Sequence, residues 1–157
     1  MTDSSFSITA GGPDDVADVL PLMRAFNDGE GIRWREEPMR GALERVIGDR
    51  SVGLVLVARE SDAGALIGYG VATFGFDIEF AGRDAFLTEL FVAAPHRGRG
   101  VGSALLDRFL GMLREARAGA VHLVVRPSNH GAQRRYEAYG FRVVPRVLMT
   151  RTFEPEV

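Results

Sequence analysis

A glycine-rich run, Arg97-Gly98-Arg99-Gly100-Val101-Gly102-Ser103, is the feature that most constrains how this chain can fold. It follows an apolar run over residues 85–92 and opens an amphipathic segment over residues 101–116, which predicts a strand, a tight turn and a helix. The first backbone N–H groups of a helix have no partner inside the helix, and the helix dipole favours negative charge there. Glycine lets a phosphate come close to the backbone, and the two arginines add donors and positive charge. The run is therefore predicted to hold a di- or polyphosphate group; an ordinary turn that leads into a helix is the alternative.

The spacing of the glycines narrows the kind of phosphate site. A Walker A loop needs a lysine after its last glycine, and the chain contains no lysine. A dinucleotide fingerprint needs G-x-G-x-x-G near the start of a βαβ unit. Here Gly98, Gly100 and Gly102 run as G-x-G-x-G, two-thirds of the way along the chain. The pattern that fits is R-x-x-G-x-G, read as Arg97, Gly100 and Gly102.

Length and composition are those of an ordinary globular protein. The chain has 157 residues, 46% of them hydrophobic and 25% charged, and we expect one domain over residues 1–157. The net charge of −2 gives no global reason to expect nucleic acid or an acidic membrane as a partner. With no cysteine and three scattered histidines, neither a disulfide nor a metal site is expected. No signal-like N-terminus is present and no apolar run reaches the ~18 residues of a membrane span, so we expect a cytoplasmic protein.

Hydrophobic periodicity and turn residues predict a mixed α/β chain. Apolar residues at helical spacing predict helices at residues 13–27, 37–47, 101–116 and 129–139. Apolar runs bounded by turn residues predict strands at residues 6–10, 52–59, 65–76, 85–92, 121–125, 141–144 and 147–153. The expected order is β-α-α-β-β-β-α-β-α-β-β, with no repeat and no linker.

A second motif, on the last predicted helix, adds to the glycine-rich run. Asn129, Ala132, Tyr136, Gly140 and Phe141 form the pattern N-x-x-A-x-x-x-Y-x-x-x-G-F. Together with the strand and loop from Leu87 to Gly102, and with the order of elements, this motif resembles the GNAT N-acetyltransferase family. The resemblance covers residues 50–153 through these motifs and the first two helices through topology alone. It implies the GNAT acyl-CoA N-acyltransferase fold and direct transfer of an acetyl group from acetyl-CoA to an amine.

The resemblance also implies which residues hold acetyl-CoA. The backbone of Leu90, Phe91 and Val92 would pair with pantetheine, where the central strand separates from the strand at residues 121–125. The pyrophosphate would lie on Arg97, Gly98, Arg99, Gly100, Val101, Gly102 and Ser103. Asn129 and Ala132 would contact pantetheine from the last helix. Asparagine is also a good helix N-cap, and that interpretation of Asn129 stays open.

Two residues are candidates for acid–base catalysis. By resemblance, Tyr136 would protonate the coenzyme A thiolate, because a phenol of pKa ~10 can donate to a thiolate formed close by; packing of an aromatic ring is the alternative. Glu89 stands in an otherwise apolar strand, where partial burial would raise its pKa toward that of a general base acting directly or through one water. An ion pair with an arginine, or a role in orienting the substrate, are the alternatives for Glu89. Thr88 occupies the position of the key acid in some polyamine-acetylating relatives, which argues against assuming a polyamine acceptor.

The acceptor is predicted to be a primary amine of a small molecule. Its pocket would come from the loop between the first two helices and from the second strand of the meander. The candidate residues there are Asn27, Trp34, Asp77 and Glu79, because acids favour a cation and an indole can stack on it; Arg33 and Arg35 would serve a carboxylate equally well. A protein N-terminus or lysine is an alternative acceptor. A non-catalytic acyl-CoA sensor and a nucleotide-binding protein of another class are alternative functions, and the resemblance favours a homodimer.

Overall fold

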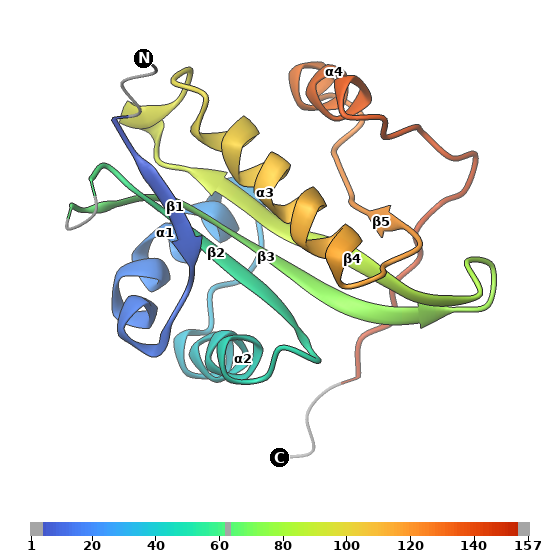
Figure 1. The fold of residues 1–157 in the computed structure, drawn as a ribbon, viewed down its shortest axis with the longest axis horizontal. Coiled ribbons are helices and arrows are strands. Elements are labelled where there is room, and N and C mark those ends of the chain that lie inside the picture. Colours follow the sequence, from blue (N-terminus) through green and yellow to red (C-terminus); the bar gives the residue numbers. More distant parts are fainter. Residues whose placement is uncertain (1–4, 62–63, 154–157) are drawn as a thin grey trace. The chain divides into compact units, whose positions relative to one another are not determined.

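The structure is organised around one mixed sheet of five strands (Figure 1). Its five strands lie side by side in sequence order: β1 (Ser7–Ala10), β2 (Gly53–Arg59), β3 (Leu66–Asp77), β4 (Gly82–Val92) and β5 (Val121–His122). The first four pair antiparallel, whereas β4 and β5 are parallel. A parallel pair needs a crossover connection, and helix α3 (Val101–Glu115) supplies it.

The computed structural model describes residues 5–61 and 64–153. The chain divides into two compact units, Met1–Leu123 and Val124–Val157, each with its own internal contacts. The single domain predicted for residues 1–157 stays a prediction.

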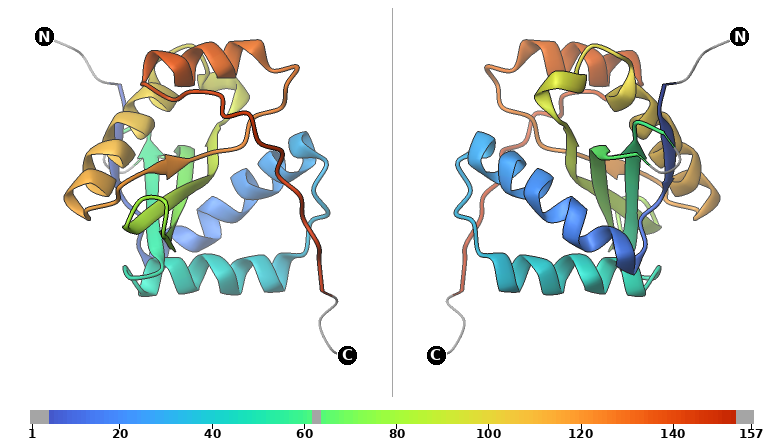
Figure 2. Two further views of the ribbon diagram at one scale, coloured as in Figure 1. Left: turned by 90° about the vertical axis from the view of Figure 1, so that its right-hand side faces the viewer. Right: turned by 90° about the vertical axis from the view of Figure 1, so that its left-hand side faces the viewer.

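Helices α1 (Val16–Glu30) and α2 (Glu36–Gly48) cover one face of the sheet, and α3 covers the other (Figure 2). A short 3-10 turn, Pro13–Asp15, leads into α1. A left-handed Gly31 with φ of 69° ends the helix, the conformation that glycine adopts without steric cost. The buried side of α1 and α2 packs on the sheet through Val16, Val19, Leu20, Met23, Leu43, Val46, Val55, Val57, Tyr69 and Val71.

On the other face, α3 lies close to β3 because β3 carries glycines beneath it. A Cβ at Gly70 would lie 2.5 Å from the Phe109 ring, and one at Gly68 would lie 3.4 Å from Val101. Phe109 is fully buried in this interface. The missing side chains therefore make room for the helix.

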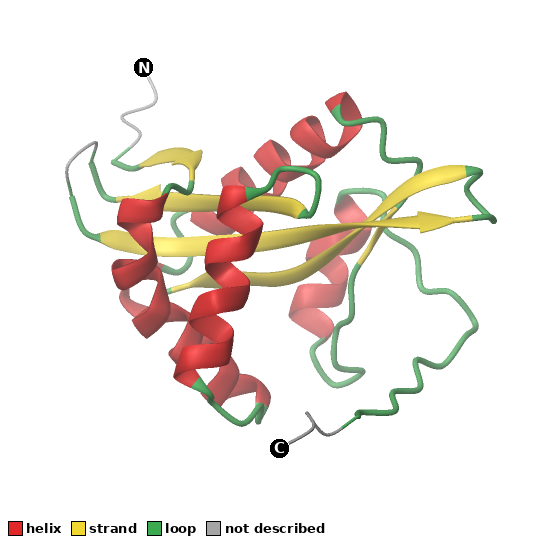
Figure 3. Ribbon diagram, turned by 90° about the horizontal axis from the view of Figure 1, so that it is seen from below, coloured by secondary structure: helices red, strands yellow, loops and turns green. Residues whose placement is uncertain are grey.

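The β3–β4 hairpin reaches past α1 and α2 at its turn end (Figures 1 and 3). Its tip exposes the side chains of Phe76 and Ile78. At the opposite end of β4 the chain enters a second 3-10 turn, Ala94–His96, and then the glycine-rich run. The two ends of β4 therefore differ: one is an exposed hairpin and the other leads into α3.

The second unit contains helix α4 (His130–Ala138). Residues 141–144 and 147–153, predicted as two strands, form no strand in the structure, and the predicted strand at residues 121–125 is shortened to β5. A strand requires a pairing partner, and the Pro145 nitrogen has no hydrogen to donate. Around Pro145 the amide of Arg146 instead donates to the Val144 carbonyl at 2.8 Å, which closes a three-residue turn.

The mixed α/β fold class predicted from the sequence is confirmed, and the order of elements agrees with the prediction up to α4. Within residues 5–61 and 64–153, no helix has both the length and the apolar character to cross a membrane.

Candidate active site

The glycine-rich run forms a turn whose backbone only glycine adopts easily. Gly98 has φ of 76°, and Gly100, the N-cap of α3, has φ of 83°. A Cβ on either residue would meet no atom within 4 Å, so the space beside them is open. The first amide that donates back into the helix is that of Ala104, which reaches the Gly100 carbonyl at 2.9 Å. The amides of Val101 and Gly102 therefore have no acceptor within the helix, the arrangement that suits an anion.

The two arginines of the run have partners in the protein. The Nε of Arg97 donates to the Val92 carbonyl at 2.9 Å, and the guanidinium lies 5.5 Å from the centroid of the Phe91 ring. This residue therefore holds the turn against the end of β4.

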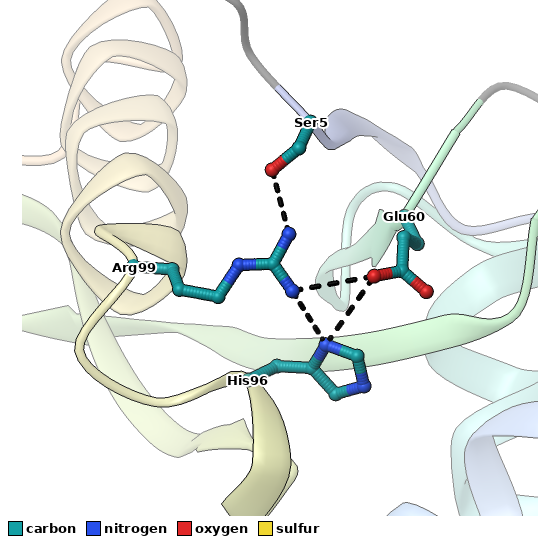
Figure 4. Close-up of polar contacts among 4 residues, drawn as sticks. All are labelled: Ser5, Glu60, His96 and Arg99. Atoms are coloured by element: carbon teal, nitrogen blue, oxygen red, sulfur yellow. Dashed lines mark hydrogen bonds and ion pairs between the residues drawn. The ribbon is translucent and has the colours of Figure 1, made fainter.

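Arg99 joins a polar cluster of four residues (Figure 4). Its guanidinium donates to Ser5 Oγ at 2.6 Å and to Glu60 Oε1 at 3.2 Å, and lies 2.9 Å from His96 Nδ1. His96 thus contacts the glycine-rich run through Arg99. The cluster connects the turn to the segment before β1 and to the residue after β2.

A β-bulge in β4 sets the direction of Glu89. Val71 pairs with Glu89 but the next residue, Ala72, pairs with Leu87, so Thr88 is the extra residue of the bulge. The Thr88 hydroxyl donates to the Val71 carbonyl at 3.1 Å. Side chains alternate along a strand, and the extra residue puts Leu87 on the α3 face and Glu89 on the face of α1 and α2. Without the bulge, Glu89 would point into the apolar layer beneath α3.

The carboxylate of Glu89 has one partner from the neighbouring strand. The fully buried Tyr69 donates its hydroxyl to Glu89 Oε2 at 2.6 Å. Burial raises the pKa of Glu89, and the Tyr69 hydrogen bond opposes this by lowering it. Tyr69 was not predicted as a site residue: its only sequence signal is a polar-tipped ring in an apolar strand, and its role depends on the strand register.

The backbone of Leu90, Phe91 and Val92 lies beyond the paired part of β5. These residues pair with Gly70, Tyr69 and Gly68 of β3, whereas β5 pairs with β4 only at Ala85 and Phe86. The Phe91 ring packs edge-on against Phe26 of α1, with centroids 6.4 Å apart. The segment predicted to bind pantetheine is thus continuous with the glycine turn on one side and with Glu89 on the other.

The remaining predicted acid–base and cofactor residues belong to the second unit. Asn129 caps α4, because its side-chain oxygen accepts from the Ala132 amide at 3.1 Å. This is the N-cap role weighed from the sequence. The Tyr136 ring contacts Phe141 edge-on, with centroids 5.7 Å apart. Local packing therefore accounts for part of this motif, and a contact with cofactor stays a prediction.

The predicted acceptor residues fall into two groups. Asn27 is buried in α1, where its Nδ2 donates to the Met23 carbonyl at 2.8 Å. Trp34 packs against the same core, and within the described residues its buried indole nitrogen has no hydrogen-bond partner. Asp77 caps the hairpin tip by accepting from the Glu79 amide at 2.8 Å. Asp77 pairs with Gly82, so at about 3.3 Å per residue it lies roughly 20 Å along the strand from Glu89.

The three histidines belong to different elements of the fold. His96 belongs to the Arg99 cluster, His122 Nε2 lies 3.1 Å from Asp84 Oδ2, and His130 begins α4. Of the residues that the structure describes, no three His, Asp or Glu side chains gather in a way that could hold a metal ion.

A family model and several solved structures match this chain. The sequence model of the acetyltransferase (GNAT) family matches residues 19–141, and the chain therefore belongs to the GNAT acetyltransferase family. Among solved structures, an integron cassette protein from the mobile metagenome of Cole Harbour Salt Marsh is 23% identical, with a TM-score of 0.81 over 95% of this chain and 91% of that one.

Two acetyltransferases are also similar. AAC(6')-Iy, solved with the bisubstrate analogue CoA-S-monomethyl-acetylneamine, is 19% identical, with a TM-score of 0.77 over 94% of this chain and 98% of that one. A ribosomal-protein-alanine N-acetyltransferase from Brucella melitensis biovar Abortus 2308 is 20% identical, with a TM-score of 0.72 over 94% of this chain and 99% of that one. At these identities the likeness establishes the shared fold.

Proposed function

We propose that this protein transfers the acetyl group of acetyl-CoA to a primary amine of a small molecule, with Glu89 as proton acceptor and Tyr136 as proton donor. The observation that carries the proposal is the Glu89 carboxylate: it is half-buried, held by Tyr69, and placed on the strand that leads into the glycine turn. A carboxylate in such surroundings has a pKa moved toward the range of a general base.

Binding of acetyl-CoA is assigned to the turn and to the strand before it. The amides of Gly98, Arg99, Gly100, Val101, Gly102 and Ser103 would hold the pyrophosphate, with charge from Arg97 and Arg99. The open space beside Gly98 and Gly100 supports this fit. The backbone of Leu90, Phe91 and Val92 would hold pantetheine, with Asn129 and Ala132 contributing from α4. Bound there, acetyl-CoA supplies an activated thioester.

Two proton transfers fall to the side chains. An ammonium group cannot attack a carbonyl, so the acceptor first loses a proton to Glu89, directly or through one water, which frees the nitrogen lone pair. The freed nitrogen would then bond to the acetyl carbon as the C–S bond breaks, and the departing thiolate would take a proton from the Tyr136 hydroxyl. The second proton that the nitrogen loses would return to the Tyr136 phenolate, and the proton held by Glu89 would pass to solvent, which restores both side chains.

A small acceptor would lie near Asn27 and Trp34. The acetylneamine portion of the bisubstrate analogue solved with AAC(6')-Iy supports an amine of this size. Asp77 and Glu79, at the hairpin tip, would be reached only by a longer acceptor. The Brucella ribosomal-protein-alanine acetyltransferase favours a protein N-terminus as the second candidate.

Calorimetric titration with acetyl-CoA, followed by a free-thiol assay with a panel of amines, tests the proposal. The panel should hold aminoglycosides, amino acids, polyamines and a peptide with an N-terminal alanine. We expect Glu89→Gln to lower kcat by about 100-fold or more, and Tyr136→Phe to lower kcat while acetyl-CoA still binds. Glu115→Gln, which changes an exposed acid at the end of α3, is the matched control.

Each contrary result points to a different protein. Binding of acetyl-CoA without thiol release from any amine would indicate a sensor. Preference for ATP or a dinucleotide would indicate another class of nucleotide-binding protein. The cytoplasmic location and the homodimer expected from the sequence belong to the same proposal, and light scattering after size-exclusion chromatography tests the second.

A further inference from the structure

The hydroxyl of Tyr69 is a buried polar group that contacts Glu89, the proposed proton acceptor. The residue is fully buried on β3, and its ring lies 6.3 Å from that of Phe91, its cross-strand neighbour. Its hydroxyl donates to Glu89 Oε2 at 2.6 Å, a short bond of the kind made to an ionised acceptor. Phenylalanine would fill the same space without a buried hydroxyl that needs a partner.

The phenol is a fixed donor that does not titrate with the carboxylate. Burial raises the pKa of Tyr69 far above that of an ordinary tyrosine, and the charge of Glu89 and the shared hydrogen bond raise it further. The proton therefore stays on Tyr69, and Glu89 is the member of the pair whose charge changes.

The other charged groups around this face lie toward solvent or are otherwise engaged. Asp18, Arg24, Asp28 and Glu30, the charged residues of α1, are exposed. Arg97 lies over the Phe91 ring and donates to the Val92 carbonyl. Burial and the Tyr69 hydrogen bond are thus the two influences on the ionisation of Glu89.

We propose that Tyr69 is the positioning residue of the proton-accepting carboxylate: its hydroxyl occupies Oε2 of Glu89, fixes the plane of the carboxyl group and leaves Oε1 to face the acceptor amine or its water. In the described part of the chain no hydrogen bond reaches Oε1. The inference rests on the proposed role of Glu89 and assigns to β3 a part of the site that neither motif contains.

The inference predicts a specific change in the pH dependence of Tyr69→Phe. Without the phenol, burial alone acts on Glu89, so its pKa rises and the acidic limb of the kcat/KM profile moves to higher pH. On the plateau we expect kcat to fall about 10- to 100-fold, the range that matches one hydrogen bond to a charged group. Tyr139→Phe removes a phenol from the second unit and should leave both the limb and the plateau in place.

A double-mutant cycle separates positioning from packing. If Tyr69 acts through Glu89, adding Tyr69→Phe to Glu89→Gln should change kcat by less than about twofold, because the group that it positions is already gone. An equal loss of kcat in both backgrounds would show a general packing role and overturn the proposal.

A measurement without turnover keeps the test independent of the reaction. Carbon-13 NMR of labelled glutamate carboxyls, in the protein without acetyl-CoA, follows the titration of Glu89, and Glu89→Gln identifies its signal. We expect the midpoint to move to higher pH in Tyr69→Phe; an unchanged midpoint would overturn the proposal. A moved midpoint in a protein that acetylates no amine would keep the coupled pair and reject the acetyltransferase function.

Discussion

The two faces of the sheet, one covered by α3 and the other by α1 and α2, differ in the side chains that they bury. The face under α3 is apolar, and the helix side chains on it are at most 1% exposed: Leu105, Leu106, Phe109 and Leu113. Gly68 and Gly70 of β3 let this helix lie close to the strand. Under α1 and α2, the layer includes Tyr69 and Asn27, and Glu89 reaches into it. One face is packed for stability, and the other gives up part of its apolar area to hold an ionisable group. The bulge at Thr88 is the feature that places Glu89 on the face covered by α1 and α2.

Inserting one alanine after Thr88 is the most severe way to break this comparison. The added residue would take the place of Glu89 opposite Val71 and shift the alternation, so that Glu89 and Phe91 turn toward α3. A carboxylate without a partner in that layer should lower the free energy of unfolding by more than about 4 kcal/mol. Thermal unfolding followed by circular dichroism measures it.

The control for the insertion is Thr88→Ala. It removes only the hydroxyl bond to the Val71 carbonyl, with an expected cost of about 0.5–1.5 kcal/mol. An insertion variant as stable as Thr88→Ala would show that the strand register does not set the facing of Glu89.

Phe109→Ala changes only the face of the sheet that α3 covers. We expect a loss of about 3–5 kcal/mol in the free energy of unfolding, because a fully buried ring leaves a cavity above Gly70. Urea denaturation gives the value. If the two faces are separate in function, the titration midpoint of Glu89 should not move, and a large shift would contradict that separation.

Two glycines of the same helix should respond with opposite signs. Gly100→Ala forces a left-handed residue at φ of 83° to carry a side chain, which should destabilise by about 1–2 kcal/mol. Gly111→Ala lies at an exposed position inside α3 with no atom near its Cβ, and should stabilise by about 0.5–1 kcal/mol. Differential scanning calorimetry of both variants measures the contrast. Destabilisation by both would mean that crowding, rather than the left-handed backbone, controls the site.

The smallest effect is the pH dependence of stability that Glu89 contributes. Its folded pKa is raised, so this contribution is fully present below the unfolded pKa of about 4.3 and is lost as pH rises through the folded value. Relative to Glu89→Gln, the wild-type protein should therefore lose stability as the pH rises from about 4. Denaturation at a series of pH values checks this; parallel curves for the two proteins would mean that the carboxyl group is not perturbed by folding.

The parts of the candidate site whose structure was predictable from sequence are those built from residues close together in the chain. The glycine turn could be recognised because its conformation and the start of α3 are local properties of residues 97–104. Glu89 could be identified as a candidate because burying an acid in an apolar strand costs free energy unless the acid has a partner or a function. Its partner Tyr69 could not be found, since the contact depends on strand register and on the one-residue bulge at Thr88.

The end of the chain shows the opposite failure. Residues 141–153 have the apolar content of strands, yet strand formation depends on a partner and not on composition. The turn closed by Val144 and Arg146 around Pro145 is a local alternative that the apolar pattern does not reveal. The acceptor candidates Asp77 and Glu79 were grouped with Asn27 for a similar reason. The sequence predicts that Asp77 and Glu79 lie at a turn, but only the length of the β3–β4 hairpin in the structure shows how far that turn lies from Glu89.

The Arg99 cluster has a consequence for when the proposed pyrophosphate-binding turn is complete. The contact of Arg99 with Ser5 spans 94 residues, and that with Glu60 spans 39, so the turn acquires these supports only after distant segments have met. Contacts of such long sequence separation form late in folding, because closing the intervening loop costs entropy first. A nascent or partly unfolded chain would present the same glycines without the support of Arg99, so the proposed binding turn would be complete only once the first unit has folded.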